Sequence, residues 1–367
     1  MEPLNKIYIE PTTRCNLRCV TCIRHVWNEP EGDMQWTTYE NIIKSLQDFP
    51  GPKTIAWAGI GEPLLHPRLP DMIRLAHEKG MRTEITTNGL LLSRDLSLAL
   101  LEAGLDQLAV SLDGASNKQY EDIRTGGSLS SVVANVHDLY ALSVKKARPL
   151  RIGIVFVAMK RNIHELPKVG ELAKMTGSSF ILVTNVIPYS ADLQDEILYH
   201  VKPNVYENSG TPQIPLWILP NMDFNALTEA SLTRILRAYS NISFLDMYLG
   251  ERSNYCPFVQ SGAIAISWQG DVSPCPALLH SHSCYIRKRP KTFYRCQFGC
   301  INEEPLSAIW SGKEFASFRK RVRAFDFPPC IDCGGCSLAE TNETDCLNNP
   351  FPVCGDCLWA RGLIRCP

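Results

Sequence analysis

The chain has 367 residues, of which 45% are hydrophobic and 20% charged, a balance typical of a folded globular protein and not of a disordered one. Lys and Arg total 37 and Asp and Glu 38, so the net charge of −1 argues against nucleic-acid binding by general attraction and against a polybasic membrane anchor. No apolar run approaches the length that spans a bilayer, and the N-terminal segment lacks the apolar core of a secretory signal. We therefore expect a cytoplasmic protein without nucleic-acid or membrane partners.

The first 185 residues alternate short apolar runs with segments of helical spacing. The predicted strands are residues 7–9, 54–58, 83–87, 108–112, 152–157 and 180–184. The predicted helices are residues 39–46, 69–77, 96–103, 132–142 and 165–175. This order predicts an α/β fold whose parallel strands curl into a partial (β/α)6 barrel resembling a TIM barrel, with an open Rossmann-like sheet as the alternative. Either fold places functional side chains in loops at the carboxyl ends of the strands.

The regular alternation of predicted strands and helices stops after residue 185. Four prolines between Pro203 and Pro220 indicate an ordered connection without a helix, and residues 227–236 then have the spacing of one amphipathic helix. From Cys256 onward the chain is rich in turns and cysteine. The sequence thus predicts a barrel over residues 1–190, a connecting segment over 191–250 and a small cysteine-rich domain over 251–367.

Cysteine is the unusual component of the composition. Three of the 15 cysteines lie between residues 15 and 22, and the other twelve lie between residues 256 and 366. An odd count and the absence of an export signal fit disulfides poorly, because the cytosol is reducing. Ligation of a metal or an iron–sulfur cluster is the better interpretation.

The first group, Cys15, Cys19 and Cys22, has the spacing C-x3-C-x2-C and follows the first predicted strand directly. Three thiolates on one loop can hold three corners of a four-iron, four-sulfur (4Fe-4S) cluster, which leaves the fourth iron open to a substrate or cofactor. The alternative is a zinc site to which His25 supplies the fourth ligand.

Further motifs follow the later strands. They are GIGEP at residues 59–63, TTNG at 86–89, VSLDG at 110–114, IRTGG at 123–127 and the segment 162–165. Together with the cysteine spacing, they resemble the radical S-adenosylmethionine (SAM) superfamily over roughly residues 5–190. The resemblance implies a SAM-binding 4Fe-4S cluster and a SAM site, with Glu62 near the methionine amino group. The SAM-binding residues that it implies are Gly61, Glu62, Asn88, Ser111, Asp113 and Arg124.

The resemblance also implies an activity. Such enzymes cleave SAM reductively to methionine and a 5′-deoxyadenosyl radical, which abstracts hydrogen from a substrate. An external electron donor such as ferredoxin or flavodoxin is then expected as a partner, besides a protein, peptide or cofactor substrate. A protein of another class, either an electron carrier or a zinc-stabilised structural protein, has no use for Glu62, Asn88 or Ser111 at strand ends.

The C-terminal cysteines resemble a SPASM domain, the auxiliary-cluster module that follows many radical SAM barrels. Cys256, Gly270 and Cys275 match its opening, while the later cysteines depart from the usual pattern at Ala339. The expected metal ligands are Cys256, Cys275, Cys330, Cys333, Cys336, Cys346, Cys354, Cys357 and Cys366. We expect two auxiliary 4Fe-4S clusters, with one cluster, alone or beside a zinc ion, as the alternative.

Two auxiliary clusters and the barrel cluster require 11 of the 15 cysteines, which leaves four spare. Cys284, Cys296 and Cys300 are the candidates for this spare set. His280 and His282 are interpreted as loop histidines and not as ligands.

The segments 183–189, 195–199 and 354–367 resemble one branch of the SPASM enzymes, the maturases of tungsten-containing aldehyde oxidoreductases. This resemblance implies action on that oxidoreductase or on its pterin cofactor. The alternative is a maturase that modifies a peptide or protein by forming a thioether or carbon–carbon crosslink or by epimerising a residue.

Overall fold

The computed structural model describes residues 2–146, 149–199, 216–220, 222–223, 225–238, 242–244, 254–332 and 336–366. Most of the predicted connection at 203–220 and the thiol Cys333 lie outside the described residues. No helix in these ranges has the length and apolar character that crossing a membrane requires.

The centre of the molecule is a mixed sheet in the order β10-β9-β1-β2-β3-β4-β5-β6-β7-β8. Neighbouring strands from β9 to β8 pair in parallel, and only β10 is antiparallel to its neighbour. The strands are β1 (Lys6–Ile9), β2 (Thr54–Trp57), β3 (Arg82–Thr87), β4 (Gln107–Ser111), β5 (Arg151–Ala158), β6 (Phe180–Asn185), β7 (Leu216–Leu219), β8 (Ile242–Phe244), β9 (Ala263–Ile266) and β10 (Val272–Ser273). The predicted fold class is confirmed, and β7 and β8 extend the sheet beyond the six predicted strands.

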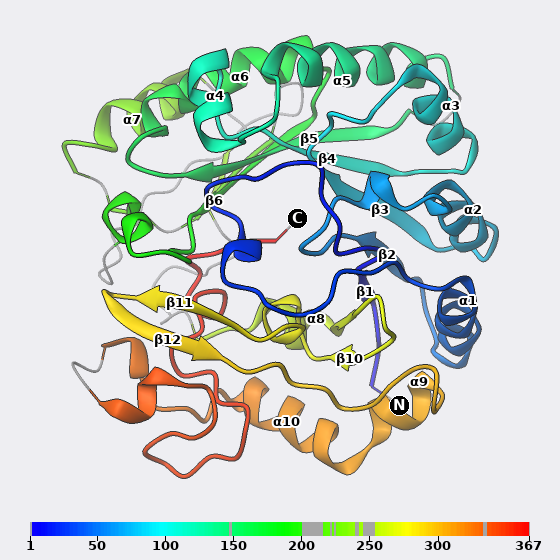
Figure 1. The fold of residues 1–367 in the computed structure, drawn as a ribbon, viewed down its shortest axis with the longest axis vertical. Coiled ribbons are helices and arrows are strands. Elements are labelled where there is room, and N and C mark those ends of the chain that lie inside the picture. Colours follow the sequence, from blue (N-terminus) through cyan, green and yellow to red (C-terminus); the bar gives the residue numbers. More distant parts are fainter. Residues whose placement is uncertain are drawn as a thin grey trace.

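Helices cover the outer face of this curved sheet (Figure 1). They are α1 (Trp36–Ser45), α2 (Leu69–Glu78), α3 (Arg94–Glu102), α4 (Asn117–Ile123), α5 (Leu129–Ser143), α6 (Leu166–Met175), α7 (Glu229–Ala238), α8 (Pro257–Ser261), α9 (Leu306–Ser311) and α10 (Lys313–Ala324). Ser93, Ser116 and Ser128 cap the first turns of α3, α4 and α5 by accepting backbone N–H groups, which explains where these helices begin. The six predicted helices correspond to α1, α2, α3, α5, α6 and α7.

The C-terminal part of the chain extends the same sheet. Strand β9 lies beside β1 with Lys6 opposite Ala263 and Ile9 opposite Ile266. All four residues of β9 are buried, which suits an apolar strand covered on both faces. The second sheet is the hairpin of β11 (His282–Ile286) and β12 (Arg289–Phe293), which lies with α9 and α10 on the β9 side of the ring (Figure 1). The division of the chain at residues 190 and 250 stays a prediction.

The carboxyl ends of the parallel strands meet at one edge of the sheet, and two chain segments enter the space between them. The loop after β1 lies inside the ring of strands, and so does the C-terminus (Figure 1). Asn185 at the end of β6 donates its side-chain N–H to the carbonyl of Leu363 at 2.8 Å, and Arg365 donates its backbone N–H to the hydroxyl of Thr184 at 2.8 Å. These contacts fix the last residues against the end of β6.

Candidate cluster and cofactor site

The cysteine motif forms a compact loop directly after β1. Cys15, Cys19 and Cys22 are free thiols, each partly exposed. The backbone N–H of Cys22 donates to the carbonyl of Cys19 at 3.0 Å, and the N–H of Arg24 donates to the sulfur of Cys22 at 3.4 Å. His25 lies with its Nε2 2.9 Å from the carbonyl of Cys19, so this nitrogen is used in a backbone contact.

The loop after α4 and the loop after β3 hold the cysteine loop. Arg18 and Val20 donate their backbone N–H groups to the carbonyls of Thr125 and Ile123, at 3.0 and 2.9 Å. After β3, the Asn88 side chain donates to the Asn16 side chain at 2.9 Å. The structure therefore brings the cysteine loop into contact with the TTNG and IRTGG motifs.

The GIGEP loop after β2 packs most closely of all against the cysteine loop. The Glu62 N–H donates to the carbonyl of Arg14 at 2.8 Å. A Cβ atom at Gly61 would lie 2.2 Å from the carbonyl oxygen of Thr12, so any larger residue must displace the backbone of the cysteine loop. Gly61 is thus required by close backbone approach.

The Glu62 carboxylate is buried and bridges two strand ends. Its Oε1 accepts from the Thr87 hydroxyl at 2.6 Å and from the Leu64 N–H at 3.1 Å, and its Oε2 accepts from the Asn88 N–H at 2.8 Å. Burial raises the pKa of Glu62, although these hydrogen bonds oppose the shift. Since an ionised carboxylate has about four acceptor positions, about one position remains for a further donor.

Asp113 and Arg124 form a buried ion pair that reaches the cysteine loop. The Arg124 Nη2 lies 2.8 Å from Asp113 Oδ2, and its Nη1 lies 3.9 Å from the sulfur of Cys19. The other Asp113 oxygen accepts from the Val157 N–H at 2.9 Å, and the Asn162 side chain donates to the Asp113 carbonyl at 2.9 Å. Burial alone would lower the pKa of Arg124, but Asp113 and Cys19 raise it. The guanidinium is therefore held as a fixed positive charge beside a thiol.

Ser111 is the last residue of β4 and is partly exposed at the same sheet edge. Glu165, which belongs to the 162–165 motif, accepts from the N–H groups of Ala115 and Ser116 at 2.7 and 3.1 Å. Burial opposes the ionised form of Glu165, but these hydrogen bonds prevail and lower its pKa. Glu165 therefore orders the turn that follows Asp113.

Two of the loop thiols, Cys19 and Cys22, are weaker acids than an ordinary cysteine. Burial raises the pKa of Cys19 to about 11, with the charge of Arg124 opposing the shift, and burial also raises the pKa of Cys22. Thiolates form here when a metal centre compensates the charge, because metal binding displaces the protons. The donor set of three sulfurs with a neighbouring fixed cation therefore fits an iron–sulfur cluster.

Four C-terminal cysteines come together from both ends of the SPASM-like region. Burial raises the pKa values of Cys256, Cys275, Cys354 and Cys357, and the charges of the other thiols in this set raise those of Cys275, Cys354 and Cys357 further. We call these four residues the inner thiol set.

A second group of cysteines, which includes Cys330 and Cys346, lies beside the inner thiol set. Burial raises the pKa of Cys330 to about 11, with smaller contributions from Asp356 and from the Cys346 thiol. A Cβ atom at Gly355 would lie 3.1 Å from the sulfur of Cys330, which places this thiol against the turn between Cys354 and Cys357. Cys336 begins the short helix Ser337–Glu340.

The remaining cysteines have other surroundings. Cys284 and Cys296 are buried and Cys300 is partly exposed. Cys366 accepts a hydrogen bond from the indole N–H of Trp359 at 3.2 Å, and Lys6 and Arg365 lie near it. The predicted ligand Cys366 is therefore placed by the end of the barrel and not in the inner thiol set.

In the described part of the chain, no three His, Cys, Asp or Glu side chains converge closely enough to hold a single metal ion.

Three residues at this sheet edge were not predicted as site residues. Glu10 follows β1, Glu29 follows the cysteine motif, and His280, expected in a solvated loop, is buried between them. Because Glu10 and His280 are 270 positions apart, no local pattern could have indicated the contact.

Comparison with known proteins agrees with this geometry. Residues 9–173 match the Radical SAM superfamily, and residues 256–337 match SPASM, an iron–sulfur cluster-binding domain. The chain is 30% identical, over 98% of its length and 96% of the other chain, to a Pyrococcus furiosus protein named tungsten-containing aldehyde ferredoxin oxidoreductase cofactor-modifying protein. The chain therefore belongs to the radical SAM superfamily and carries a SPASM domain, which implies SAM, a 4Fe-4S cluster and auxiliary iron–sulfur clusters as its cofactors.

One further relative and one solved structure of similar fold cover nearly the whole chain. A PqqA peptide cyclase from Granulibacter bethesdensis is 24% identical over 97% of this chain and 86% of its own. The crystal structure of Streptococcus suis SuiB bound to precursor peptide SuiA superposes with a TM-score of 0.60 at 16% identity, covering 91% of this chain and 70% of that one. The similarity to SuiB concerns the fold alone.

Proposed function

We propose that this radical SAM enzyme matures a tungsten-containing oxidoreductase by modifying that protein or its pterin cofactor. The observation that carries the proposal is the similarity to the Pyrococcus furiosus cofactor-modifying protein, which extends through the barrel and the cysteine-rich end of the chain. An external electron donor such as ferredoxin or flavodoxin is part of this proposal.

The residues of these loops would each bind either the cluster or SAM. When bound, the cluster supplies the electron that cleaves SAM to methionine and a 5′-deoxyadenosyl radical. Cys15, Cys19 and Cys22 would hold three of its irons. The remaining acceptor position of Glu62 would receive the SAM ammonium group, and the Arg124 guanidinium would bind negative charge near Cys19.

We further propose the ligands of the two auxiliary clusters. The inner thiol set would hold one cluster, and Cys330, Cys333, Cys336 and Cys346 would hold the other. The mutual influence of the inner thiols and the proximity of Cys330 to Cys346 support this division. Cys284, Cys296, Cys300 and Cys366 then remain without a cluster.

This division predicts iron content. Wild-type protein reconstituted anaerobically should contain about 12 iron atoms per chain, and the Cys354→Ala/Cys357→Ala variant about 8, because one auxiliary cluster loses two ligands. The partly exposed Cys300 offers a matched control, so Cys300→Ala should retain about 12. Iron analysis that finds equal contents in the wild type and the double variant would refute the assignment of the inner thiol set.

A peptide or protein substrate is the second candidate. It is favoured by the whole-length similarity to the PqqA peptide cyclase. An auxiliary cluster suits either reaction, since it can take up an electron as a substrate radical is oxidised. The two candidates differ in which molecule gains or loses mass.

The test is to produce the tungsten oxidoreductase in cells with the wild-type enzyme or with its Cys15→Ala/Cys19→Ala/Cys22→Ala variant. We expect full oxidoreductase activity only with the wild type, together with a changed mass of the pterin cofactor or of the oxidoreductase polypeptide. Which of the two masses changes identifies the molecule that the enzyme modifies. Identical activities and masses in both preparations would overturn the maturase proposal.

A further inference from the structure

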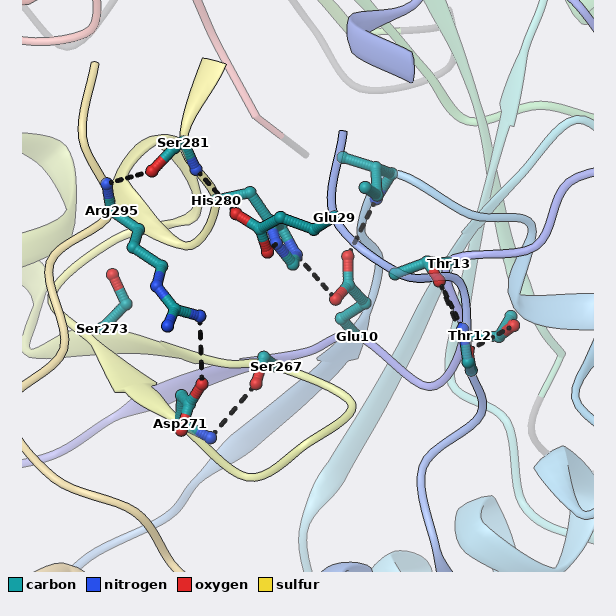
Figure 2. A network of polar contacts seen from close by, with 12 residues as sticks. Glu10, Thr12, Thr13, Glu29, Ser267, Asp271, Ser273, His280, Ser281 and Arg295 are labelled. Atoms are coloured by element: carbon teal, nitrogen blue, oxygen red, sulfur yellow. Dashed lines mark hydrogen bonds and ion pairs between the residues drawn. The ribbon is translucent and has the colours of Figure 1, made fainter. Parts of the chain in front are cut away.

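His280 lies between two carboxylates that come from distant parts of the chain. Its Nε2 is 2.8 Å from Glu10 Oε2, and its Nδ1 is 2.7 Å from Glu29 Oε2 (Figure 2). Glu10 follows β1, Glu29 lies in the loop after the cysteine motif, and His280 lies just before β11. We call these three residues the carboxylate–histidine clamp.

The clamp is closed to solvent on the barrel side. The side chains of His280 and Glu10 are 4% and 0% exposed, and that of Glu29 is 23% exposed. The indole of Trp27 packs edge-on against the imidazole, with ring centroids 5.7 Å apart. Glu29 also accepts the Ser281 N–H at 3.1 Å. Charged groups buried to this degree are stable only when they are paired and hydrogen-bonded.

The geometry determines the charge of the imidazole. A carboxylate faces each ring nitrogen, and an ionised carboxylate only accepts hydrogen bonds, so this arrangement favours an imidazolium that donates from both nitrogens. Burial alone lowers the pKa of His280, but Glu10 and Glu29 outweigh burial and raise it. Burial alone would raise the pKa of Glu29, but its hydrogen bonds with His280 and Ser281 lower it.

Other charged groups surround the clamp at longer range. Asp271 and Arg295, which lie 3.7 Å apart, influence it from the β10 side (Figure 2). His282 is the next histidine along the chain, and burial lowers its pKa. The Nδ1 of His282 lies 3.0 Å from the carbonyl of His280, and burial favours the neutral form of this second ring.

The clamp is linked directly to the GIGEP loop. The second Glu10 oxygen, Oε1, accepts the N–H of Ile60 at 3.2 Å. A Cβ atom at Gly59 would lie 2.7 Å from Glu10 Cγ, so the loop rests on the Glu10 side chain without room between them. Two residues further along the same loop is Glu62, which is tied to Thr87 and Asn88. Any movement of Glu10 therefore moves the backbone that positions Glu62.

We propose that His280 is a positioning residue that, as an imidazolium, holds the GIGEP loop and the SPASM region in the arrangement that binds SAM. This inference rests on the proposed SAM site. Deprotonation of His280 would leave two carboxylates facing one remaining donor, so Glu10 and the loop would lose their fixed position. The affinity for SAM, and the packing of the SPASM region against the barrel, would then depend on whether His280 is protonated.

The direction of the pH effect follows from the raised pKa. The contribution of the imidazolium is fully present below the ordinary histidine pKa of about 6.5 and is lost as the pH rises through the higher value in the folded protein. SAM carries an α-amino group that also titrates, with an ordinary pKa of about 7.7–8.0. This titration of SAM is the same for every protein variant. It therefore cancels when the dissociation constant of a variant is divided by that of the wild type.

The experiment measures SAM binding to reconstituted holoenzyme by calorimetry between pH 6 and pH 9. His280→Gln should bind SAM about tenfold more weakly than the wild type at pH 6, because a charged hydrogen-bond donor is lost, and the ratio should approach one at high pH. His282→Gln, the matched control in the same hairpin, should keep a ratio near one throughout. A ratio near one for His280→Gln at pH 6, or a ratio that is constant with pH, would overturn the proposal.

A second variant keeps the test decisive if His280→Gln fails to fold, as judged by its iron content. Glu29→Gln removes one carboxylate from the more exposed side of the clamp, so the pH at which SAM affinity falls should move downward. An unmoved transition would contradict the proposal. Wild-type protein that binds no SAM would refute the proposed function as well, whereas equal binding by wild type and His280→Gln refutes this inference alone.

Discussion

Removal of the three loop thiols is expected to abolish SAM cleavage. The Cys15→Ala/Cys19→Ala/Cys22→Ala variant should contain about four fewer iron atoms than the wild type and form no 5′-deoxyadenosine with a chemical reductant. The reason is that no other described cysteine lies in this loop, so the cluster there loses every protein ligand. Product formation is measured by chromatography and mass spectrometry after anaerobic incubation with SAM.

The control for this prediction is the Cys300→Ala variant, which should keep both its iron content and its rate of 5′-deoxyadenosine formation. The triple variant should also retain the iron of the SPASM region. If the triple variant formed 5′-deoxyadenosine at the wild-type rate, the assignment of the SAM-binding cluster to this loop would be wrong.

Disruption of the Asp113–Arg124 pair is expected to have the largest effect on stability. Asp113→Asn preserves the shape of the side chain but places an amide N–H₂ or a neutral oxygen against a buried guanidinium. Removing one partner of a buried ion pair costs about 3–5 kcal/mol of unfolding free energy, because the other charge remains uncompensated. Chemical unfolding followed by circular dichroism measures the loss.

The double variant Asp113→Asn/Arg124→Gln separates charge from packing. It contains no buried charge at this site, so it should recover much of the stability lost in Asp113→Asn while SAM binding stays impaired. Equal stabilities of Asp113→Asn and the wild type would show that the ion pair does not contribute to the fold as we describe.

Local patterns were sufficient to predict the barrel. The predicted strands at residues 83–87 and 180–184 differ from β3 and β6 by one residue at one end, because each is a β-rich run bounded by turns. Strands β7 and β8 were missed because β7 lies within the proline-rich stretch, between Pro215 and Pro220, and β8 has only three residues. Strand β9 has only four residues, Ala263–Ile266, and its partner β1 lies more than 250 positions away.

The site was predicted in part for the same reason. Gly61, Glu62, Asn88 and Asp113 lie in short motifs that each follow a predicted strand, and parallel strands bring such motifs to one edge. Arg124 follows α4 instead and reaches this edge through its ion pair with Asp113. The roles of these residues toward SAM stay predictions.

Contacts between distant segments could not be predicted. The gathering of Cys354 and Cys357 with Cys256 and Cys275 is not expressed in any spacing, and neither is the burial of His280 between Glu10 and Glu29. Both depend on how the C-terminal region packs across the open end of the barrel. They are products of tertiary structure and not of local sequence.

We propose that the cysteine loop and the strand-end motifs form one site at which a cluster and SAM meet. The most direct measurement is electron paramagnetic resonance of the reduced protein before and after addition of SAM, in the wild type and in the triple cysteine variant. We predict that SAM changes the signal of one cluster in the wild type, and that this signal and its response are absent from the variant while the auxiliary signals remain. A wild-type spectrum that SAM leaves unchanged, or a response that persists in the triple variant, would contradict the account.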